Sequence, residues 1–503
     1  MKCLVFLCLL CASTTSGNGS PKVIIVGSGP AGIAAASRLI QNGIDDVRIL
    51  EAENRFGGRI KTVRIGEYST DMGAQWVHGE VGNVGYELAA PFDLVTKVVK
   101  PGDTQEPVYD VLFVDSSGTT LPPEGIKDFV GAVGEFEKNI SGVDDLRTGS
   151  YGEYLRKRLN DFFGEHPEIQ AKFHKPLTHS IELVMMAIVG AESADDVSAL
   201  GVKNSPPCFG WRDLNWKEKT YSTILDILMK RYPNADEELP VLNKIVFNKR
   251  VIKINSTGEG PVKVITADGT EYTADHVIFT GSLGVLKADH EKIFEPPLPE
   301  KNKNAIERIG MGKNGKILIY HDNPWWTHEA KVPTQVIHNF LWTEDDRKLL
   351  ENDPERAWML GLTYGFEVEW RPKLFQIWLS GAHLEQMEKN SEELFKNQTL
   401  EILDRFFGNM YNLTEPTEIQ RSSWNTNENF RGSYSYQTMQ SVNMKSGPAE
   451  LGEPVMRGGI PVVLFAGEAT EPRYYSMVHG AIGSGWREAD RLINLYREKK
   501  SSE

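Results

Sequence analysis

Apolar residues near the start of the chain follow the pattern of a β-α-β unit. The run KVIIV at 22–26 predicts a short buried strand, and a glycine turn comes directly after it. A helix of small residues then leads into a second apolar strand that ends at Glu51. The pattern therefore predicts strand, turn, helix and strand over 22–51.

Three more stretches carry strand patterns. In the middle of the chain, 245–255 and 262–274 read as strands, with a hairpin turn at Ala267–Gly269, and 276–286 reads as one further apolar strand. Near the end, 461–470 reads as a buried strand that runs into a polar turn. Apolar residues at helical spacing predict helices over 479–496, 151–163 and 391–407.

The first residues predict a cleaved secretory signal peptide over 1–19. Met1 and Lys2 precede the apolar run CLVFLCLLCA, which is followed by the small polar run STTSGNGS. The apolar run is much shorter than the roughly 20 residues needed to span a bilayer, and we expect no membrane span later in the chain. The ending KKSSE is neither an endoplasmic-reticulum nor a peroxisomal signal, so secretion is the expected destination.

Composition indicates a large globular core and excludes some partners. The chain has 503 residues, of which 40% are hydrophobic and 25% charged. Its net charge of -14 argues against nucleic acid or an anionic membrane as the principal partner. Outside the signal the chain has one cysteine, Cys208, which predicts an inert thiol and excludes a disulfide within the mature chain. Together with secretion, the N-x-S/T sequons predict glycosylation; they lie at Asn18, Asn139, Asn255, Asn397 and Asn412.

The glycine turn after the first strand has the spacing of a dinucleotide site. Gly27, Gly29 and Gly32 form G-x-G-x-x-G at the head of the helix, where glycines allow a tight turn and close approach of a pyrophosphate. Glu51 stands at the tip of the next strand, where a carboxylate can accept ribose hydroxyl hydrogen bonds. We predict an α/β chain of mixed α+β character, with a Rossmann-like domain interleaved with a substrate domain of mixed sheet and helices. The dinucleotide-binding segments are expected at 21–95, 241–295 and 451–498, and the substrate-domain segments at 96–240 and 296–450.

Residues after Glu51 favour FAD over a nicotinamide dinucleotide. Gly57, Gly58 and Arg59 form a second glycine pair with a guanidinium suited to phosphate oxygens. This stretch resembles FAD-binding oxidases, and Gly467 with Glu468 resembles their second flavin contact.

From Lys22 to about Tyr496 the chain resembles flavin-containing amine oxidases of the polyamine oxidase and spermine oxidase type. The resemblance is carried by DMGAQWVHG (71–79), VIFTGSLGVLK (277–287), AIERIGMGKNGKILI (305–319), SSWNTNENFRGSYSY (422–436) and LFAGEATEPRYYSMVHGA (464–481). It implies the fold of the amine oxidases. It also implies FAD binding by Glu51, Arg59, Val251, Trp424 and Glu468, and passage of Ala74, Gln75, Trp76 and Val77 close to the isoalloxazine ring.

The resemblance also implies two catalytic residues and a chemistry. Lys316 corresponds to the lysine that reaches flavin N5 through a water, and His78 to the active-site histidine of animal polyamine oxidases. Hydride would leave the α-carbon of a neutral amine for the flavin, and the imine would hydrolyse to an aldehyde and a shorter amine. Oxygen would then restore the oxidised flavin and yield hydrogen peroxide.

Candidate substrate contacts are Trp76, Tyr434, Tyr475, Ser476 and Met477. Met477 stands where monoamine oxidases and plant polyamine oxidases have a tyrosine, which favours a polyamine over an aryl monoamine. Monoamine oxidases attach flavin through a cysteine, but no cysteine follows Cys208. FAD is therefore expected to be non-covalent. Glu182 and Glu192 are candidates for binding distal ammonium groups, although a solvated helix charge also explains each.

Two alternatives stay open at this point. An L-amino-acid oxidase would need a fixed arginine near the flavin for the substrate carboxylate. A secreted FAD-binding protein without turnover would keep the dinucleotide motifs, but the presence of both His78 and Lys316 argues against it. The preferred polyamine, the carbon oxidised and the oligomeric state do not follow from the sequence.

Overall fold

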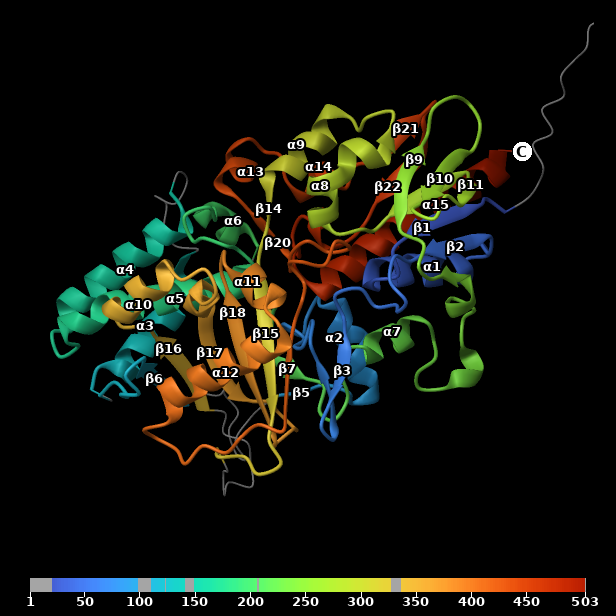
Figure 1. Ribbon diagram of the computed structural model, residues 1–503. Coiled ribbons are helices and arrows are strands. Elements are labelled where there is room, and N and C mark those ends of the chain that lie inside the picture. Colours follow the sequence, from blue (N-terminus) through green and yellow to red (C-terminus); the bar gives the residue numbers. More distant parts are fainter. Residues whose placement is uncertain are drawn as a thin grey trace, which may run out of the picture.

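The structure, a computed structural model, describes residues 20–97, 110–122, 124–140, 149–205, 208–326 and 336–502. The predicted signal peptide at 1–19, with the sequon at Asn18, lies outside the described residues, as does the side chain of Asn139. Figure 1 shows two parts side by side, one around β1 and α15 and the other around β15 to β18.

A six-stranded sheet forms the centre of the first part. Its five consecutive strands from β22 to β8 run parallel, and β21 pairs antiparallel at the edge. All six strands lie within the segments 21–95, 241–295 and 451–498. In order across the sheet they are β21 (Val455–Arg457), β22 (Ile460–Phe465), β12 (His276–Phe279), β1 (Val23–Val26), β2 (Val47–Leu50) and β8 (Ile245–Val246).

The predicted β-α-β unit is confirmed by β1, α1 (Pro30–Gln41) and β2. The helix packs closely on its own strand because Gly32 has no side chain: a Cβ there would meet the carbonyl oxygen of Gly27 at 2.1 Å. The last helix, α15 (Val478–Ser502), shares a hydrophobic core with α1 and lies beside it in Figure 1. The two ends of the chain are therefore packed together.

The middle of the chain differs in part from its predicted pattern. The hairpin is confirmed by β10 (Val262–Thr266) and β11 (Glu271–Ala274), which join β9 (Val251–Asn255) and β13 (Phe294–Glu295) in a four-stranded sheet. The prediction of one strand over 276–286 is wrong, since β12 ends at Phe279 and α8 (Leu283–Ile293) begins four residues later. The side chain of Ser282 accepts a hydrogen bond from the Gly284 amide and so starts the helix.

A second six-stranded sheet forms the other part. One face packs against α10 (Glu344–Glu351), α11 (Leu384–Lys389) and α12 (Glu392–Phe407) through a shared hydrophobic core. Residues of the opposite face line a cavity, described below. In order the strands are β19 (Glu418–Arg421), β15 (Asn314–Tyr320), β18 (Leu374–Ser380), β17 (Leu362–Glu367), β16 (Val336–Leu341) and β6 (Asp110–Asp115).

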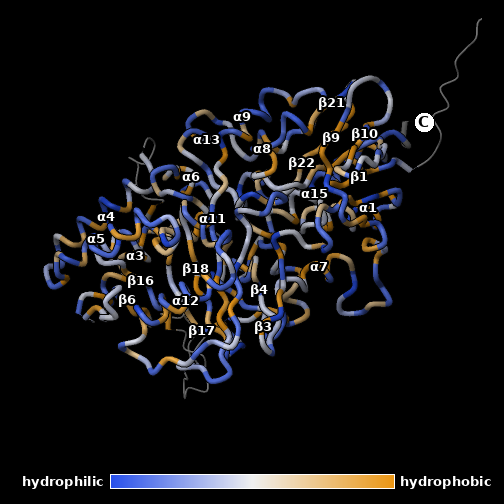
Figure 2. Tube along the Cα trace, in the orientation of Figure 1, coloured by the Kyte–Doolittle hydropathy of each residue, from blue (hydrophilic) through white to orange (hydrophobic). Residues whose placement is uncertain are grey.

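Smaller elements complete the molecule. Figure 2 shows hydrophobic residues gathered on the central strands and hydrophilic residues on outer helices and loops. None of the helices in the described ranges is long and apolar enough to cross a membrane. The remaining elements are β3 (Thr62–Ile65), β4 (Tyr68–Asp71), β5 (Thr96–Lys97), β7 (Leu214–Asn215), β14 (Ile309–Met311), β20 (Ser435–Gln437), α2 (Val84–Ala89), α3 (Ile126–Asn139), α4 (Tyr151–Glu165), α5 (His174–Val189), α6 (Ala199–Asn204), α7 (Thr223–Leu228), α9 (Glu300–Arg308), α13 (Met439–Asn443) and α14 (Pro448–Leu451).

Candidate active site

A cavity of about 1520 Å³ lies between the two six-stranded sheets. Its lining begins at the glycine turn after β1 and extends to aromatic side chains of β17 and β18. Pockets for a single small molecule usually measure about 300 to 1,000 Å³, so this cavity has room for a dinucleotide and a second ligand.

Glycines form a cradle at one end of the cavity. Gly27 has a φ of 99°, in the left-handed region that favours glycine. Gly29 and Gly58 face each other so closely that a Cβ on Gly58 would meet the Cα of Gly29 at 3.2 Å. Helix α1 begins beside them without a side-chain cap, and its first residues line the cavity. Free amide groups at a helix N-terminus attract phosphate, so this end suits a diphosphate.

The carboxylate of Glu51 lies at the end of β2, beside this cradle. It accepts hydrogen bonds from the amide of Ser28 at 2.8 Å, from the Ser28 hydroxyl at 2.5 Å and from the amide of Glu53 at 2.8 Å. These donors fix a buried carboxylate that also lines the cavity. Val251 and Trp424 line the cavity too.

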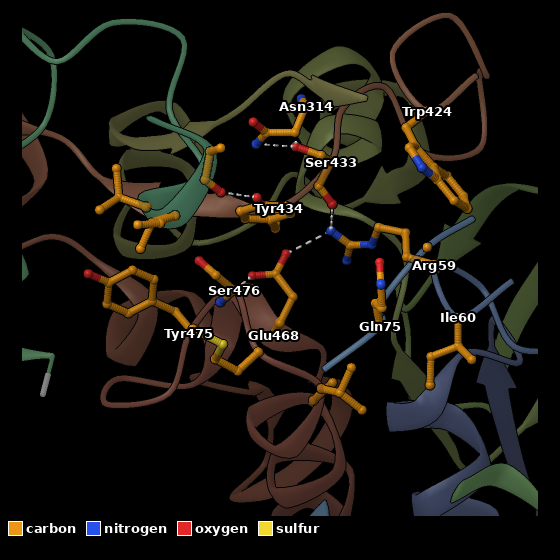
Figure 3. Close-up of a pocket in the computed structure, with 18 of the residues that line it drawn as sticks. Arg59, Ile60, Gln75, Asn314, Trp424, Ser433, Tyr434, Glu468, Tyr475 and Ser476 are labelled. Atoms are coloured by element: carbon orange, nitrogen blue, oxygen red, sulfur yellow. Dashed lines mark hydrogen bonds and ion pairs between the residues drawn. The ribbon is translucent and has the colours of Figure 1, made fainter. Parts of the chain in front are cut away.

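The carboxylate of Glu468 joins the two ends of the chain. Arg59 Nη1 donates to Glu468 Oε1 at 2.9 Å and to the carbonyl of Ser433 at 2.7 Å, as Figure 3 shows. Glu468 Oε2 accepts from the Ser435 hydroxyl at 2.5 Å and from the Ser476 amide at 2.8 Å. Ser476 has a φ of 68°, a strained conformation for a residue with a side chain, which aims its amide at Glu468.

Lys316 reaches the cavity from the middle of β15. Its Nζ donates to the carbonyls of Asp71 at 3.1 Å and Gly73 at 2.8 Å, and to Gln75 Oε1 at 2.8 Å. The side chain is 2% exposed, and burial lowers the pKa of its ammonium and raises the pKa of the Asp71 carboxyl. Its ammonium is therefore held in place by three oxygen atoms at the cavity wall.

His78 lines the cavity at a more open position. Its Nδ1 lies 2.7 Å from Asp213 Oδ1, and its side chain is 37% exposed. Burial by itself would raise the pKa of Asp213, but the hydrogen bond and the positive charge of His78 lower it below its usual value. The carboxylate orients the imidazole, whose other nitrogen remains available to a ligand.

The candidate substrate residues also gather around the cavity. Trp76, Tyr434, Tyr475, Ser476 and Met477 all line it. The Tyr434 hydroxyl donates to the carbonyl of Ala187 in α5, and Figure 3 shows its ring between Ser433 and Ser476. Burial raises the pKa of Tyr434, and it raises that of Tyr475 to about 12, so both are neutral hydrogen-bonding groups.

Two of the predicted cofactor residues do not line the cavity. The side chain of Val77 is fully buried in the hydrophobic core that includes α1, and its backbone pairs with Leu214. The Val77 side chain points away from the cavity because it packs in that core. Gly32 lies behind the cradle, where it allows the helix packing described above. The other predicted cofactor residues line the cavity; they are Gly27, Gly29, Glu51, Arg59, Ala74, Gln75, Trp76, Val251, Trp424 and Glu468.

Several lining residues were missed by sequence reasoning. Asn314, 2% exposed, lines the cavity two residues before Lys316, and strand alternation around Lys316 could have found it. Asp213, which orients His78, lies 135 positions away in the sequence, so no local pattern signals the pair. Glu369 and the aromatic residues of β17 and β18 lacked a signal as well, because their role depends on how the sheet faces the cavity.

Comparison with known proteins identifies the family. Residues 30–493 match the family described as flavin containing amine oxidoreductase. The chain is 30% identical to the human peroxisomal N(1)-acetyl-spermine/spermidine oxidase, with 96% of this chain and 97% of the relative covered. It is 30% identical to polyamine oxidase 1 of Oryza sativa subsp. japonica, with 95% and 98% covered.

A solved structure shares the fold. The wild-type putrescine oxidase bound to putrescine superposes with a TM-score of 0.67 at 18% identity, over 94% of this chain and 99% of that one. The family match and the similarity to the relatives confirm the resemblance seen in the sequence motifs. The chain belongs to the flavin-containing amine oxidoreductase family and is an FAD-dependent amine oxidase.

Proposed function

We propose that this protein is a secreted oxidase of polyamines: spermine, spermidine or their N-acetylated forms. The observation that carries the proposal is the continuity of the dinucleotide cradle with a buried, aromatic-lined chamber that contains Lys316. The overall reaction takes an amine R–CH₂–NH–R′, O₂ and water to R–CHO, H₂N–R′ and H₂O₂. Similarity over almost the full length to relatives named for oxidising polyamines supports this substrate class.

The residues at the cradle fit FAD. The facing Gly29 and Gly58 leave space for a pyrophosphate beside the N-terminus of α1, and Glu51 would hold ribose hydroxyls. Arg59 and Glu468 lie further along the same cavity, where they would contact the rest of the cofactor. When bound, FAD supplies the two-electron acceptor for the amine.

The chamber would favour the reactive form of the substrate. An amine gives up hydride only as the neutral base, since its lone pair must stabilise the cation that forms. The half-buried aromatic side chains of Trp76, Tyr434 and Tyr475 would lower the pKa of a bound amine, because they solvate its charged form poorly. His78, oriented by Asp213, would accept or donate a hydrogen bond at the substrate nitrogen.

Lys316 would act in the oxygen half of the reaction. Its ammonium is fixed by the carbonyls of Asp71 and Gly73 and by Gln75. A fixed charge stabilises negative charge that develops on oxygen, and a buried one does so without solvent reorganisation.

Arginine placement argues against an L-amino-acid oxidase. Among the described residues, four arginines line the cavity. Arg59 pairs with Glu468 and Arg250 with Glu428, while Arg212 and Arg473 are exposed. A substrate carboxylate would therefore lack a buried guanidinium held for it.

Secretion is proposed from the signal-like segment at 1–19. Exposed Asn397 and Asn412 support glycosylation of these sequons, because a glycan needs an accessible amide. Asn255 is partly buried, and its Nδ2, the atom that would carry the glycan, donates to Glu295 Oε2 at 3.4 Å, which makes it a poorer glycosylation site. Expression of the full-length chain tests this part: a protein without residues 1–19 should be released into the culture medium, and its mass should fall on deglycosylation.

A peroxide assay tests the activity. The FAD-loaded protein is mixed with spermine, spermidine, their N-acetylated forms, monoamines and leucine, and product masses identify the bond cleaved. Peroxide from at least one polyamine at a higher kcat/KM than from any monoamine supports the proposal. Turnover of leucine without turnover of polyamines would establish an amino-acid oxidase, and bound flavin without turnover would establish a binding protein.

A further inference from the structure

A polyamine carries more than one ammonium group, and the two carboxylates suggested by the sequence do not face the cavity. Glu182 Oε1 pairs with Arg156 Nη1 at 2.6 Å, and Glu192 Oε1 lies 3.5 Å from Lys313 Nζ. Neither residue lines the cavity. Recognition of the ammonium group that is not oxidised must therefore come from elsewhere.

Glu369 is a carboxylate that does line the cavity. It follows β17 in the connection to β18 and is 5% exposed. Trp76 Nε1 donates to its Oε1 at 3.3 Å, which places the carboxylate beside a predicted substrate contact. Arg371, two residues later, donates to the carbonyls of Ser69 at 2.7 Å and Lys219 at 2.9 Å, so the connection is fixed to the body of the protein.

An aromatic wall extends from Trp76 over the face of the second six-stranded sheet that lines the cavity. The Trp76 ring stacks on Trp378 with centroids 5.7 Å apart and lies 5.9 Å from Phe366. Tyr364 stacks on Phe366 at 5.9 Å, and all four rings line the cavity. The Lys316 ammonium already lies 4.7 Å from the Trp378 ring centroid, which shows that this wall accommodates an alkylammonium group.

We propose that Glu369, with Trp76 and Phe366, forms the subsite that binds the second, non-reacting ammonium group of a di- or polyamine substrate. The aromatic faces attract the cation and cover its methylenes, and the buried carboxylate supplies its counter-charge. This inference rests on the proposed function, because it assigns the recognition of a polycationic substrate within the same cavity.

The test compares two ligands that differ only in the second ammonium group. Binding of 1,8-diaminooctane and of octylamine to the FAD-loaded protein is measured by calorimetry under anaerobic conditions at pH 8. The wild type should bind the diamine about 10- to 100-fold more tightly than the monoamine. In Glu369→Gln, which keeps an acceptor for Trp76, that preference should fall to about twofold or less, with octylamine affinity unchanged.

Two further variants separate recognition from structure. Glu367→Gln removes a carboxylate two positions away that does not line the cavity, and it should leave the preference as in the wild type. Glu369→Asp keeps the charge one methylene further back and should retain part of the preference. If Glu369→Gln does not retain flavin, Glu369→Asp provides the test. It should bind 1,8-diaminooctane less tightly than the wild type does and bind octylamine equally tightly.

The outcomes separate this inference from the proposed function. An unchanged preference in Glu369→Gln, or an equal loss of affinity for both ligands, would overturn the subsite even if polyamines are oxidised. A preference that depends on Glu369 in a protein that oxidises no amine would overturn the proposed function and leave the subsite established.

Discussion

Arg59 Nη1 and Glu468 Oε1 lie 2.9 Å apart although 409 positions separate the two residues in the chain. Arg59 follows the second glycine turn and Glu468 follows β22, so the contact closes one wall of the cavity between the two ends of the chain. Formation of this wall therefore depends on the packing of both ends against each other.

Glu468→Ala should weaken retention of FAD. The change leaves the hydroxyl of Ser435 and the amide of Ser476 without their acceptor, and it leaves the Arg59 guanidinium with the carbonyl of Ser433 but without its counter-charge. Loss of such contacts in a buried site costs about 1 to 3 kcal/mol, so the flavin-to-protein absorbance ratio should fall on dilution. Glu471→Ala, three positions later and outside the cavity lining, is the matched control, and equal occupancy in both variants would contradict this assignment.

Flavin should leave the protein intact on acid precipitation. Cys208, the cysteine in the described residues, is buried with its Sγ 3.8 Å from His479 Nε2, and burial raises the pKa of its thiol. A protonated thiol is a poor nucleophile, so we expect no attachment to the cofactor even though Cys208 lines the cavity. Absorbance of supernatant and pellet measures the distribution, and yellow precipitated protein would show a covalent bond.

Lys316→Met should separate cofactor binding from turnover. Removal of a preorganised charge usually costs about 10² to 10³ in rate, so stopped-flow reoxidation by O₂ should slow while FAD stays bound. The variant should also unfold at a lower temperature, because the carbonyls of Asp71 and Gly73 lose a donor. Lys313→Met, on the turn before β15 and outside the cavity lining, should change neither rate nor occupancy.

His78→Asn should lower kcat/KM for the amine by about 10² or more and leave FAD occupancy unchanged. The reason is that His78 is held by Asp213 at the cavity rather than at the dinucleotide cradle. His166→Asn is the matched control. His166 Nδ1 lies 2.7 Å from Glu168 Oε1, so this histidine is also paired with a carboxylate, but it does not line the cavity. A normal kcat/KM in His78→Asn would remove this residue from the mechanism.

The contribution of His321 to the free energy of unfolding should fall as the pH decreases from 6.5 towards 4. Burial lowers the pKa of His321 to about 4, so within this window the unfolded chain binds a proton that the folded chain does not. Above pH 6.5 His321 is neutral in both the folded and the unfolded chain. At pH 4, protonation of His321 in the unfolded chain should lower the free energy of unfolding by about 3 kcal/mol. His321→Asn, which can still bond Thr414 Oγ1, should flatten the dependence of Tm on pH, whereas an unaltered slope would assign it to other groups.

Much of the dinucleotide end could be predicted because its determinants are local. The fingerprint at Gly27 and Gly29 and the carboxylate of Glu51 lie within one β-α-β unit, whose geometry fixes their spacing. The prediction of one strand over the apolar run 276–286 is wrong, because β12 ends at Phe279 and α8 follows. There the hydroxyl of Ser282 starts a helix, and apolar residues alone do not separate a buried strand from a buried helix.

The substrate end was decided by tertiary structure. Sequence reasoning considered Glu182 and Glu192 for ammonium binding, yet both pair with basic residues outside the cavity, and Glu369 lines it. It also placed Val77 at the flavin, whereas the side chain lies in the core. A sequence pattern determines which residues share one face of a strand or helix, but only the packing of the two sheets decides which face meets the cavity.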